Sequence, residues 1–260
     1  MYPILLTLGP INIYTFGVFL FAGFFLGSFI IWRRLRDQGW QEEKILDFLF
    51  LAALAGLLFS RTGFVITHFE LFYPSLARVF LLGRYPGLSF WSGILGGFLA
   101  MGWFIRQNRW HFWKVIDEVI FGLAPFTVLF HLGAFFDGSK AGQETGAFWG
   151  VFFPESLVRR QPVALFETIG FWLIWLFLLR IERRWRTWSW YKSHVSGFIA
   201  LAFFIPALFL SFLLAFIEED KLYLVYSKQL LSLGLALGTI ILLYFRSGRR
   251  FKEDLKIKKR

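Results

Sequence analysis

The chain of 260 residues contains no cysteine. No disulfide, thiol nucleophile or thiolate metal site can therefore form, and redox chemistry by the protein's own side chains is excluded. Histidine is scarce too, and the four residues show no metal-ligand spacing: they are His68, His111, His131 and His194. The sequence has neither a Gly-x-Ser-x-Gly element nor a phosphate-binding loop. It predicts neither a metal site nor a cofactor.

Charged residues are also few, at 17% of the chain, whereas 57% of the residues are hydrophobic and 22% are aromatic. This composition is too apolar for an ordinary soluble domain and indicates a membrane protein. The apolar stretches are long and continuous, while an outer-membrane barrel would show segments of about ten residues with alternating polarity. The sequence therefore predicts an all-α, polytopic integral membrane protein.

Apolar stretches near the roughly 20 residues that cross a bilayer recur along the chain. About seven transmembrane helices are predicted, and Lys228 in the last would reach the interface by snorkelling. The predicted spans are Ile13 to Trp32, Ile45 to His68, Leu88 to Ile105, Val115 to Phe136, Val163 to Leu179, Val195 to Ile217 and Leu224 to Phe245.

The distribution of basic residues tests this division, because short cytoplasmic loops collect Lys and Arg. With seven spans, one side of the membrane receives twenty Lys and Arg residues and the other receives seven. We therefore expect the N-terminus outside and the C-terminus inside. The expected organisation is one transmembrane helical domain over residues 1–245, with an outer-face loop over 137–162, and a basic cytoplasmic tail over 246–260.

The net charge of +11 could suggest a nucleic-acid-binding protein. However, the basic residues are confined to alternate loops and the tail, as topology requires, and no soluble domain carries a binding face. We therefore expect no nucleic-acid partner. Anionic phospholipid headgroups are the natural partner of the tail from Arg246 to Arg260.

The segment from the end of the fourth predicted span through the 137–162 loop is rich in glycine and polar residues. Gly133, Gly138 and Gly142 recur there beside Asp137 and Lys140. Such a segment at membrane depth is tolerated where it faces protein or a wet cavity, which favours a pocket open to the outer leaflet. Close helix packing by small residues is the alternative explanation, and the residues alone leave both open.

Several segments in a fixed order resemble the prolipoprotein diacylglyceryl transferase family. The match begins at Leu8-Gly9-Pro10-Ile11-Asn12-Ile13, covers about two thirds of the chain and includes six motifs in family order. They are Ser60 to Val65, Gly87 to Gly93, Ala124-Pro125, Gly133 to Gly142, Trp149 to Pro154 and Arg160 to Glu167.

The resemblance implies a transferase of lipoprotein biosynthesis in the bacterial inner (plasma) membrane. Its members move a diacylglyceryl group from phosphatidylglycerol to a cysteine thiol of a lipobox-containing prolipoprotein. Phosphatidylglycerol or another anionic phospholipid and prolipoproteins are therefore the expected partners. In an active member with a diverged site, the candidate catalytic residues are His131 and Asp137. The candidate lipid- or phosphate-binding residues are Arg61, Gly138, Gly142, Arg160 and Glu167.

The chain departs from the family at residues expected to react. Trp91 stands where the family has His, His131 and Ala134 stand where it has Arg and Asn, and Ser139 replaces a Glu. The family's sixth helix carries an arginine, but residues 197–216 hold no charge. Arginine suits phosphate binding because its guanidinium is bidentate and permanently charged. A catalytically degenerate relative that binds phospholipid or a partner membrane protein is therefore the alternative to an active transferase.

Ionisable residues within predicted spans are functional candidates. Arg61 is interpreted as a buried partner of a carboxylate or a lipid phosphate, with a structural pair to Glu167 or Asp117 as the alternative. His131 could supply positive charge if a carboxylate such as Asp137 raised its pKa. Asp117 could simply complement the dipole at the start of its own helix.

Tryptophans gather in the loops that are expected on the inner side. They are Trp40, Trp110, Trp113, Trp185, Trp188 and Trp190. Because tryptophan concentrates at membrane interfaces, the sequence interpretation is an aromatic belt and not a binding site.

Overall fold

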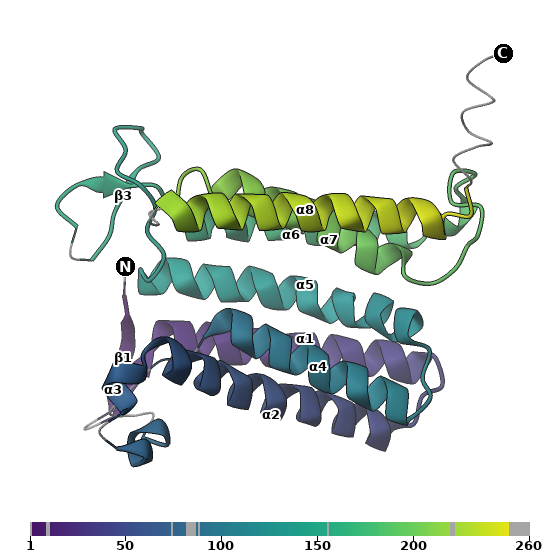
Figure 1. Ribbon diagram of the computed structural model, residues 1–260, viewed down its shortest axis with the longest axis horizontal. Coiled ribbons are helices and arrows are strands. Elements are labelled where there is room, and N and C mark those ends of the chain that lie inside the picture. Colours follow the sequence, from purple (N-terminus) through teal and green to yellow (C-terminus); the bar gives the residue numbers. More distant parts are fainter. Residues whose placement is uncertain are drawn as a thin grey trace. The chain divides into compact units, whose positions relative to one another are not determined.

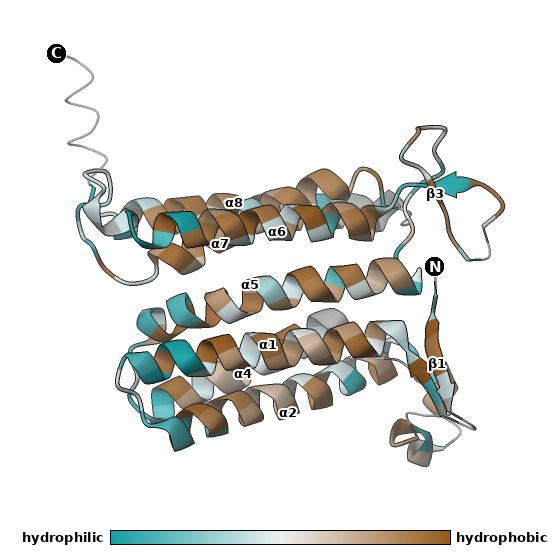
Figure 2. Cartoon of the chain, turned by 180° about the vertical axis from the view of Figure 1, so that it is seen from behind, coloured by the Kyte–Doolittle hydropathy of each residue, from teal (hydrophilic) through white to brown (hydrophobic). Residues whose placement is uncertain are grey.

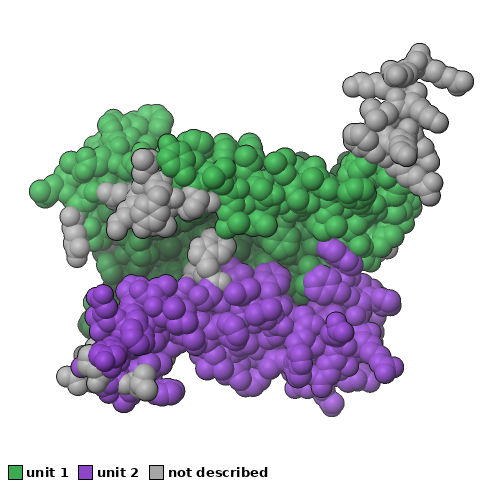
Figure 3. Space-filling view, viewed as in Figure 1, with its two compact units in different colours: residues 1–31, 116–260 green, residues 32–115 purple. Residues whose placement is uncertain are grey.

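The structure is a computed structural model that describes residues 2–8, 11–73, 75–81, 87, 89–154, 156–218 and 222–249. Most of the predicted basic tail, from residue 250 onward, lies outside the described residues, as does Leu88. The chain forms two compact units, residues 32–115 and residues 1–31 with 116–260, coloured separately in Figure 3. Each unit is described by itself below.

In the unit of residues 32–115, two long helices pack closely together. The elements are α2 (Glu42–Thr67), α3 (Phe69–Phe72), the 3-10 helix η1 (Leu76–Val79) and α4 (Phe90–Gln107) (Figure 1). A Cβ atom on Gly63 of α2 would lie 2.0 Å from the Ser92 hydroxyl of α4, and one on Gly96 would lie 2.4 Å from Phe59. Small residues thus bring the two backbones together, as is common for membrane helices.

The other unit contains a short N-terminal hairpin and five helices, all or most of whose residues belong to it. Its elements are β1 (Ile4–Leu8), β2 (Ile11–Tyr14), α1 (Thr15–Asp37), α5 (Phe112–Asp137), β3 (Val151–Phe152), β4 (Arg159–Arg160), α6 (Val163–Glu182), the 3-10 helix η2 (Trp185–Thr187), α7 (Phe198–Leu214) and α8 (Leu222–Arg246). β1 pairs antiparallel with β2, and β3 pairs antiparallel with β4. The first predicted span was placed to begin at Ile13, but that residue belongs to β2 and the helix begins at Thr15, after a hairpin that the apolar run did not reveal.

Within this unit, glycine allows α1 and α5 to approach closely. A Cβ atom on Gly122 of α5 would lie 2.3 Å from the carbonyl oxygen of Gly27, and one on Gly27 would lie 2.7 Å from that of Gly122. No side chain fits at either position without movement of the backbone. This contact fixes α5, the helix that carries His131.

The same unit has two distinct ends, and the chain alternates between them. At one end the backbone N–H of Tyr2 donates to Phe136 at the end of α5, and the 138–162 loop and the segment after α7 also lie there. At the other end Asp117 near the start of α5 contacts Gly197 before α7, and Ser193 donates to Ser247 after α8 at 3.1 Å. This up-and-down course is the geometry that a multi-pass membrane protein requires.

Each predicted span overlaps a helix of the structure. Among the described residues, five helices are long and apolar enough to cross a membrane: Thr15–Asp37, Glu42–Thr67, Phe112–Asp137, Val163–Glu182 and Lys228–Arg246. Helix α7 is apolar but shorter, with 17 residues. Figure 2 shows hydrophobic colours along these helices and hydrophilic colours towards many of their ends. The all-helical membrane class is therefore confirmed, while the span count, the orientation and the division into one domain and a tail stay predictions.

Candidate functional site

A histidine and a glutamate form a buried pair between α5 and α6. The Nδ1 atom of His131 lies 2.9 Å from Oε2 of Glu167. Both residues are buried, with 7% and 6% of their surfaces exposed. The imidazole also stacks on Phe171 at 5.1 Å between ring centroids and an interplanar angle of 4°. Glu167 and Phe171 are one turn apart on α6. The same side of this helix therefore contacts the edge of the His131 imidazole through Glu167 and its flat surface through Phe171.

Two lysines and a second glutamate extend this pair into a chain of five titratable side chains. The Lys140 ammonium contacts Oε1 of Glu167 and lies 3.3 Å from Oε1 of Glu218. Lys228, near the start of α8, contacts Oε2 of Glu218. We call His131, Glu167, Lys140, Glu218 and Lys228 the charged cluster. It joins α5, α6, the 138–162 loop, the segment after α7, and α8.

The charged cluster is buried on its acidic side and accessible on its basic side. The side chains of Glu167 and Glu218 are 8% and 6% exposed, but those of Lys140 and Lys228 are 31% and 29% exposed. Carboxylates lose much hydration when buried, and paired ammonium groups compensate for this cost. The lysines therefore stabilise the buried charge and also present positive charge at the surface of this unit.

The 138–162 loop is fastened beside the charged cluster by backbone contacts. The Gln143 N–H donates to the Ile217 carbonyl at 2.9 Å, and the Gly142 N–H donates to the Gln161 carbonyl at 2.9 Å. A Cβ atom on Gly142 would lie 2.5 Å from the Ile217 carbonyl oxygen. The glycine that the resemblance implied for lipid binding thus allows the loop to lie against residues 217–218, which positions Lys140.

Three other predicted site residues lie in the same segment without joining the charged cluster. Asp137 is half-buried at the end of α5, and Gly138 ends that helix with φ 78°. Arg160 on β4 donates from Nε to the Ser156 hydroxyl at 3.0 Å and lies 3.7 Å from Glu144. The carboxylate beside His131 is thus that of Glu167 and not that of Asp137.

Arg61 belongs to the unit of residues 32–115 and has backbone partners there. Its guanidinium donates to the carbonyls of Val79 at 2.8 Å, Gly87 at 3.0 Å and Arg78 at 3.2 Å. It also lies 5.1 Å above the ring of Phe72. These contacts fix the connection between α2 and α4, and they differ from the carboxylate pair that the sequence suggested.

Asp117 caps a helix other than its own. Its carboxylate accepts hydrogen bonds from the backbone N–H groups of Gly197 at 2.5 Å and Ala200 at 2.9 Å, at the start of α7. The expected role at the start of its own helix is therefore wrong, because α5 already begins at Phe112. Asp117 satisfies N–H groups that have no partner within α7.

Sequence reasoning did not select Glu218 and Lys228 as site residues, and it noted Lys140 only as a polar loop residue. Lys228 lies within a predicted span, which is itself a functional signal. Without a known acidic partner, however, a lysine whose side chain snorkels to the membrane interface explained Lys228 equally well. Glu218 lies directly after the sixth predicted span. It is 78 residues from Lys140 along the chain and 10 residues from Lys228, and only the fold reveals that it contacts both.

The charged cluster can accept a proton and hold an anion. A neutral imidazole whose Nδ1 faces a carboxylate is oriented to act as a base through Nε2. In the part of the chain that the structure describes, there is no group of three or more His, Asp or Glu residues able to hold a metal ion. The fold and the site thus define a multi-pass helical membrane protein with acid–base and cationic side chains at one end of its helices.

Comparison with known proteins identifies the family. A model of the prolipoprotein diacylglyceryl transferase family matches residues 3–245, so the chain belongs to that family. Curated relatives named phosphatidylglycerol–prolipoprotein diacylglyceryl transferase include that of Aeromonas hydrophila, 27% identical over 91% of this chain and 85% of the relative. That of Vibrio atlanticus is 27% identical over 97% and 94%, and that of Pseudoalteromonas atlantica is 29% identical over 92% and 83%.

Proposed function

We propose that this protein transfers the diacylglyceryl group of phosphatidylglycerol to the cysteine thiol of a prolipoprotein. The sulfur forms a bond to the glyceryl carbon, the bond from that carbon to the phosphate oxygen breaks, and glycerol phosphate leaves with the electron pair. The thiol proton must be taken up by a base. The observation that carries the proposal is the His131–Glu167 pair on a framework whose family match covers residues 3–245.

His131 is the proposed base for the thiol. Its pairing at 2.9 Å with Glu167 leaves the other ring nitrogen for the substrate, and stacking on Phe171 restricts rotation of the ring. The imidazolium formed on proton transfer would be stabilised by the adjacent carboxylate. Asp137, at the end of α5, is a second candidate for proton transfer. We rank it below His131 because it does not belong to the charged cluster.

Lys140 and Lys228 are the proposed contacts for the phosphate. An ammonium group carries three N–H donors, so the contacts of Lys140 with Glu167 and Glu218 leave capacity for a phosphate oxygen. Arg160 on the neighbouring strand, together with the backbone at Gly138 and Gly142, would complete the lipid-binding surface. The two lysines would then stabilise the negative charge of the phosphate, the role that arginines have in the family.

The proposed setting is the bacterial plasma membrane, with seven spans, the N-terminus outside and the charged cluster towards the outer side. One transmembrane domain over residues 1–245 would carry a cytoplasmic tail. The alternation of basic residues supports this orientation. Phe148 and Leu157 of the outer loop are 88% and 98% exposed, which suits contact with acyl chains or a prolipoprotein. Phosphatidylglycerol or another anionic phospholipid is the proposed lipid partner, and we expect no nucleic-acid partner.

The test is diacylglyceryl transfer from labelled phosphatidylglycerol to a lipobox peptide by the purified full-length protein. His131→Ala should lower the transfer rate by about 10²- to 10⁴-fold, since this is the usual contribution of a general base. His111→Ala, which removes an exposed histidine in another loop, is the matched control and should retain the wild-type rate.

Two results would count against the proposal. Absence of transfer above background by well-folded wild type would favour a degenerate relative that only binds phospholipid. Equal rates for wild type and His131→Ala would leave the transferase activity standing but remove His131 from the role of base.

A further inference from the structure

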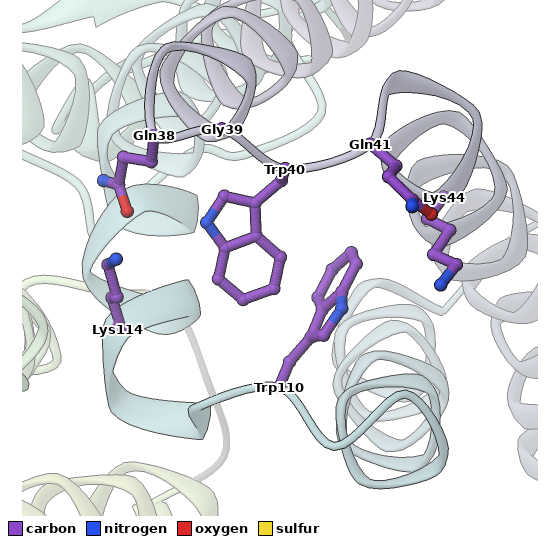
Figure 4. Close-up of a pocket in the computed structure, with 7 residues that line it drawn as sticks. All are labelled: Gln38, Gly39, Trp40, Gln41, Lys44, Trp110 and Lys114. Carbon is purple, nitrogen blue, oxygen red and sulfur yellow. The ribbon is translucent and has the colours of Figure 1, made fainter.

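A pocket that the transfer reaction does not use lies in the unit of residues 32–115. Its volume is about 370 Å³, and it opens where the α1–α2 and α4–α5 connections meet. The residues that line it are Gln38, Gly39, Trp40, Gln41, Lys44, Trp110 and Lys114 (Figure 4). Both connections are on the side where the charge distribution places the cytoplasm.

Two tryptophans form an ordered apolar surface in this pocket. The rings of Trp40 and Trp110 meet edge to face, with centroids 4.2 Å apart and an interplanar angle of 80°. Phe48 and Phe104 lie behind Trp110 at 5.8 Å and 5.4 Å. The two indoles contact one another within one pocket, so together they offer a continuous apolar surface at the position of the predicted aromatic belt.

Polar and cationic groups flank the indoles. Figure 4 shows Gln38 and Lys114 on one side of the tryptophan pair and Gln41 and Lys44 on the other. Both lysines are exposed, and no acidic residue lines the pocket among the described residues. Gly39 has φ 83°, a left-handed conformation that favours glycine in the turn that places Trp40.

We propose that this pocket binds the headgroup of an anionic phospholipid of the inner leaflet. The ammonium groups of Lys44 and Lys114, on the two sides of the indoles, would attract the anionic headgroup, and the Gln41 amide would donate hydrogen bonds to headgroup hydroxyls. The indoles would pack against the glycerol and the first acyl carbons, the contact that an amphipathic ring makes at an interface. Lysines near the membrane surface attract anionic lipids.

The indoles favour a lipid over free phosphate. Inorganic phosphate would interact with the two ammonium groups but would gain nothing from the paired indoles of Trp40 and Trp110. A headgroup with its glycerol uses both the cationic and the apolar parts. The proposal rests on the membrane orientation and is independent of the transfer reaction.

The test is native mass spectrometry of the full-length protein in detergent, titrated with phosphatidylglycerol or with phosphatidylcholine of the same acyl chains. Because the charged cluster is a second proposed site for phosphatidylglycerol, the titrations use proteins that all carry Lys140→Gln/Lys228→Gln. In that background one phosphatidylglycerol should bind with higher affinity than phosphatidylcholine. The Lys44→Gln/Lys114→Gln variant should bind that lipid roughly 30-fold more weakly, since each lysine contributes about 1 kcal/mol at an anionic surface.

The control variant Arg183→Gln/Lys192→Gln also removes two exposed positive charges from connections predicted on the inner side. It should bind phosphatidylglycerol as wild type does. Equal losses in both double variants, or equal affinity for the two lipids, would overturn the proposal. Displacement of the lipid by equimolar inorganic phosphate would identify a free-anion site instead.

Transfer assays separate this proposal from the proposed enzyme activity. The Lys44→Gln/Lys114→Gln variant should transfer diacylglyceryl at the wild-type rate when phosphatidylglycerol is saturating. If wild type shows no transfer, the lipid titration still decides whether the pocket binds. A variant that loses transfer and keeps the lipid would place the two lysines in the reaction and contradict the assignment.

Discussion

The two ends of the unit formed by residues 1–31 and 116–260 each bury one carboxylate from α5 or α6, but the partners differ. Asp117 is 7% exposed and accepts hydrogen bonds from two backbone N–H groups at the start of α7. Glu167 is 6% exposed and contacts the side chains of His131 and Lys140. The two carboxylates are therefore equally buried, and the identity of their partners is what distinguishes the proposed functional carboxylate from the helix-capping one.

The largest effect is expected at Glu167. Glu167→Gln keeps the shape of the side chain but removes the carboxylate charge 2.9 Å from Nδ1 of His131. We expect diacylglyceryl transfer to fall by about 10²- to 10³-fold. The measurement is the transfer rate per folded molecule, with folding checked by gel filtration.

Glu70→Gln is the control, because Glu70 is an exposed carboxylate in the other unit. It should leave the transfer rate unchanged. If Glu167→Gln is as active as this control, Glu167 does not take part in the reaction. Both buried carboxylates would then have only a structural role.

A smaller effect, on stability and not on chemistry, is expected at Asp117. Asp117→Ala leaves the N–H groups of Gly197 and Ala200 without their acceptor. The free energy of unfolding should therefore fall by about 2 kcal/mol. The thermal midpoint in a fixed detergent should then fall by roughly 4–8 °C. Asp37→Ala, at an exposed position with surface ion pairs, should change it little.

Transfer by Asp117→Ala at a temperature well below its midpoint sharpens the comparison. A rate per folded molecule close to that of wild type is expected. A loss comparable to that of Glu167→Gln, with an unchanged midpoint, would assign Asp117 to the reaction.

The smallest effect is expected at Arg61. Arg61→Lys retains the positive charge, but an ammonium group cannot donate to all three carbonyls that the guanidinium contacts. The free energy of unfolding should therefore fall by about 1 kcal/mol. A modest fall in the thermal midpoint with an unchanged affinity for phosphatidylglycerol is the expected result. A large loss of lipid affinity at an unchanged midpoint would instead support the direct lipid contact that the sequence suggested.

Much of the helical framework could be predicted from the sequence, because apolar runs of bilayer length leave the backbone few alternatives to a helix. The predicted span Val163 to Leu179 corresponds to α6, which ends three residues later at Glu182. The hairpin of β1 and β2 was not predicted. Its residues are as apolar as those of the following helix, and hydropathy alone cannot separate a short strand from the start of a span.

The candidate site was predictable only in part. His131 and Glu167 were selected from separate motifs, but the contact between them joins residues 36 positions apart and depends on how α5 packs on α6. Lys228 and Glu218 form an ion pair that no local pattern announces. Arg61 drew attention as a buried charge, and its carbonyl partners come from an irregular connection whose course no periodicity predicts.

The fastening of the 138–162 loop has a practical consequence for labelling the protein. The backbone N–H groups of Gly142 and Gln143 donate hydrogen bonds to residues 161 and 217. An insertion beside Gly142 would therefore separate Lys140 from its carboxylate partners. Phe148, by contrast, projects from the loop with 88% of its surface exposed. A peptide tag or fluorophore attached beside Phe148 would leave the anchored base of the loop undisturbed, and its accessibility in intact cells would test the predicted outer position of this loop.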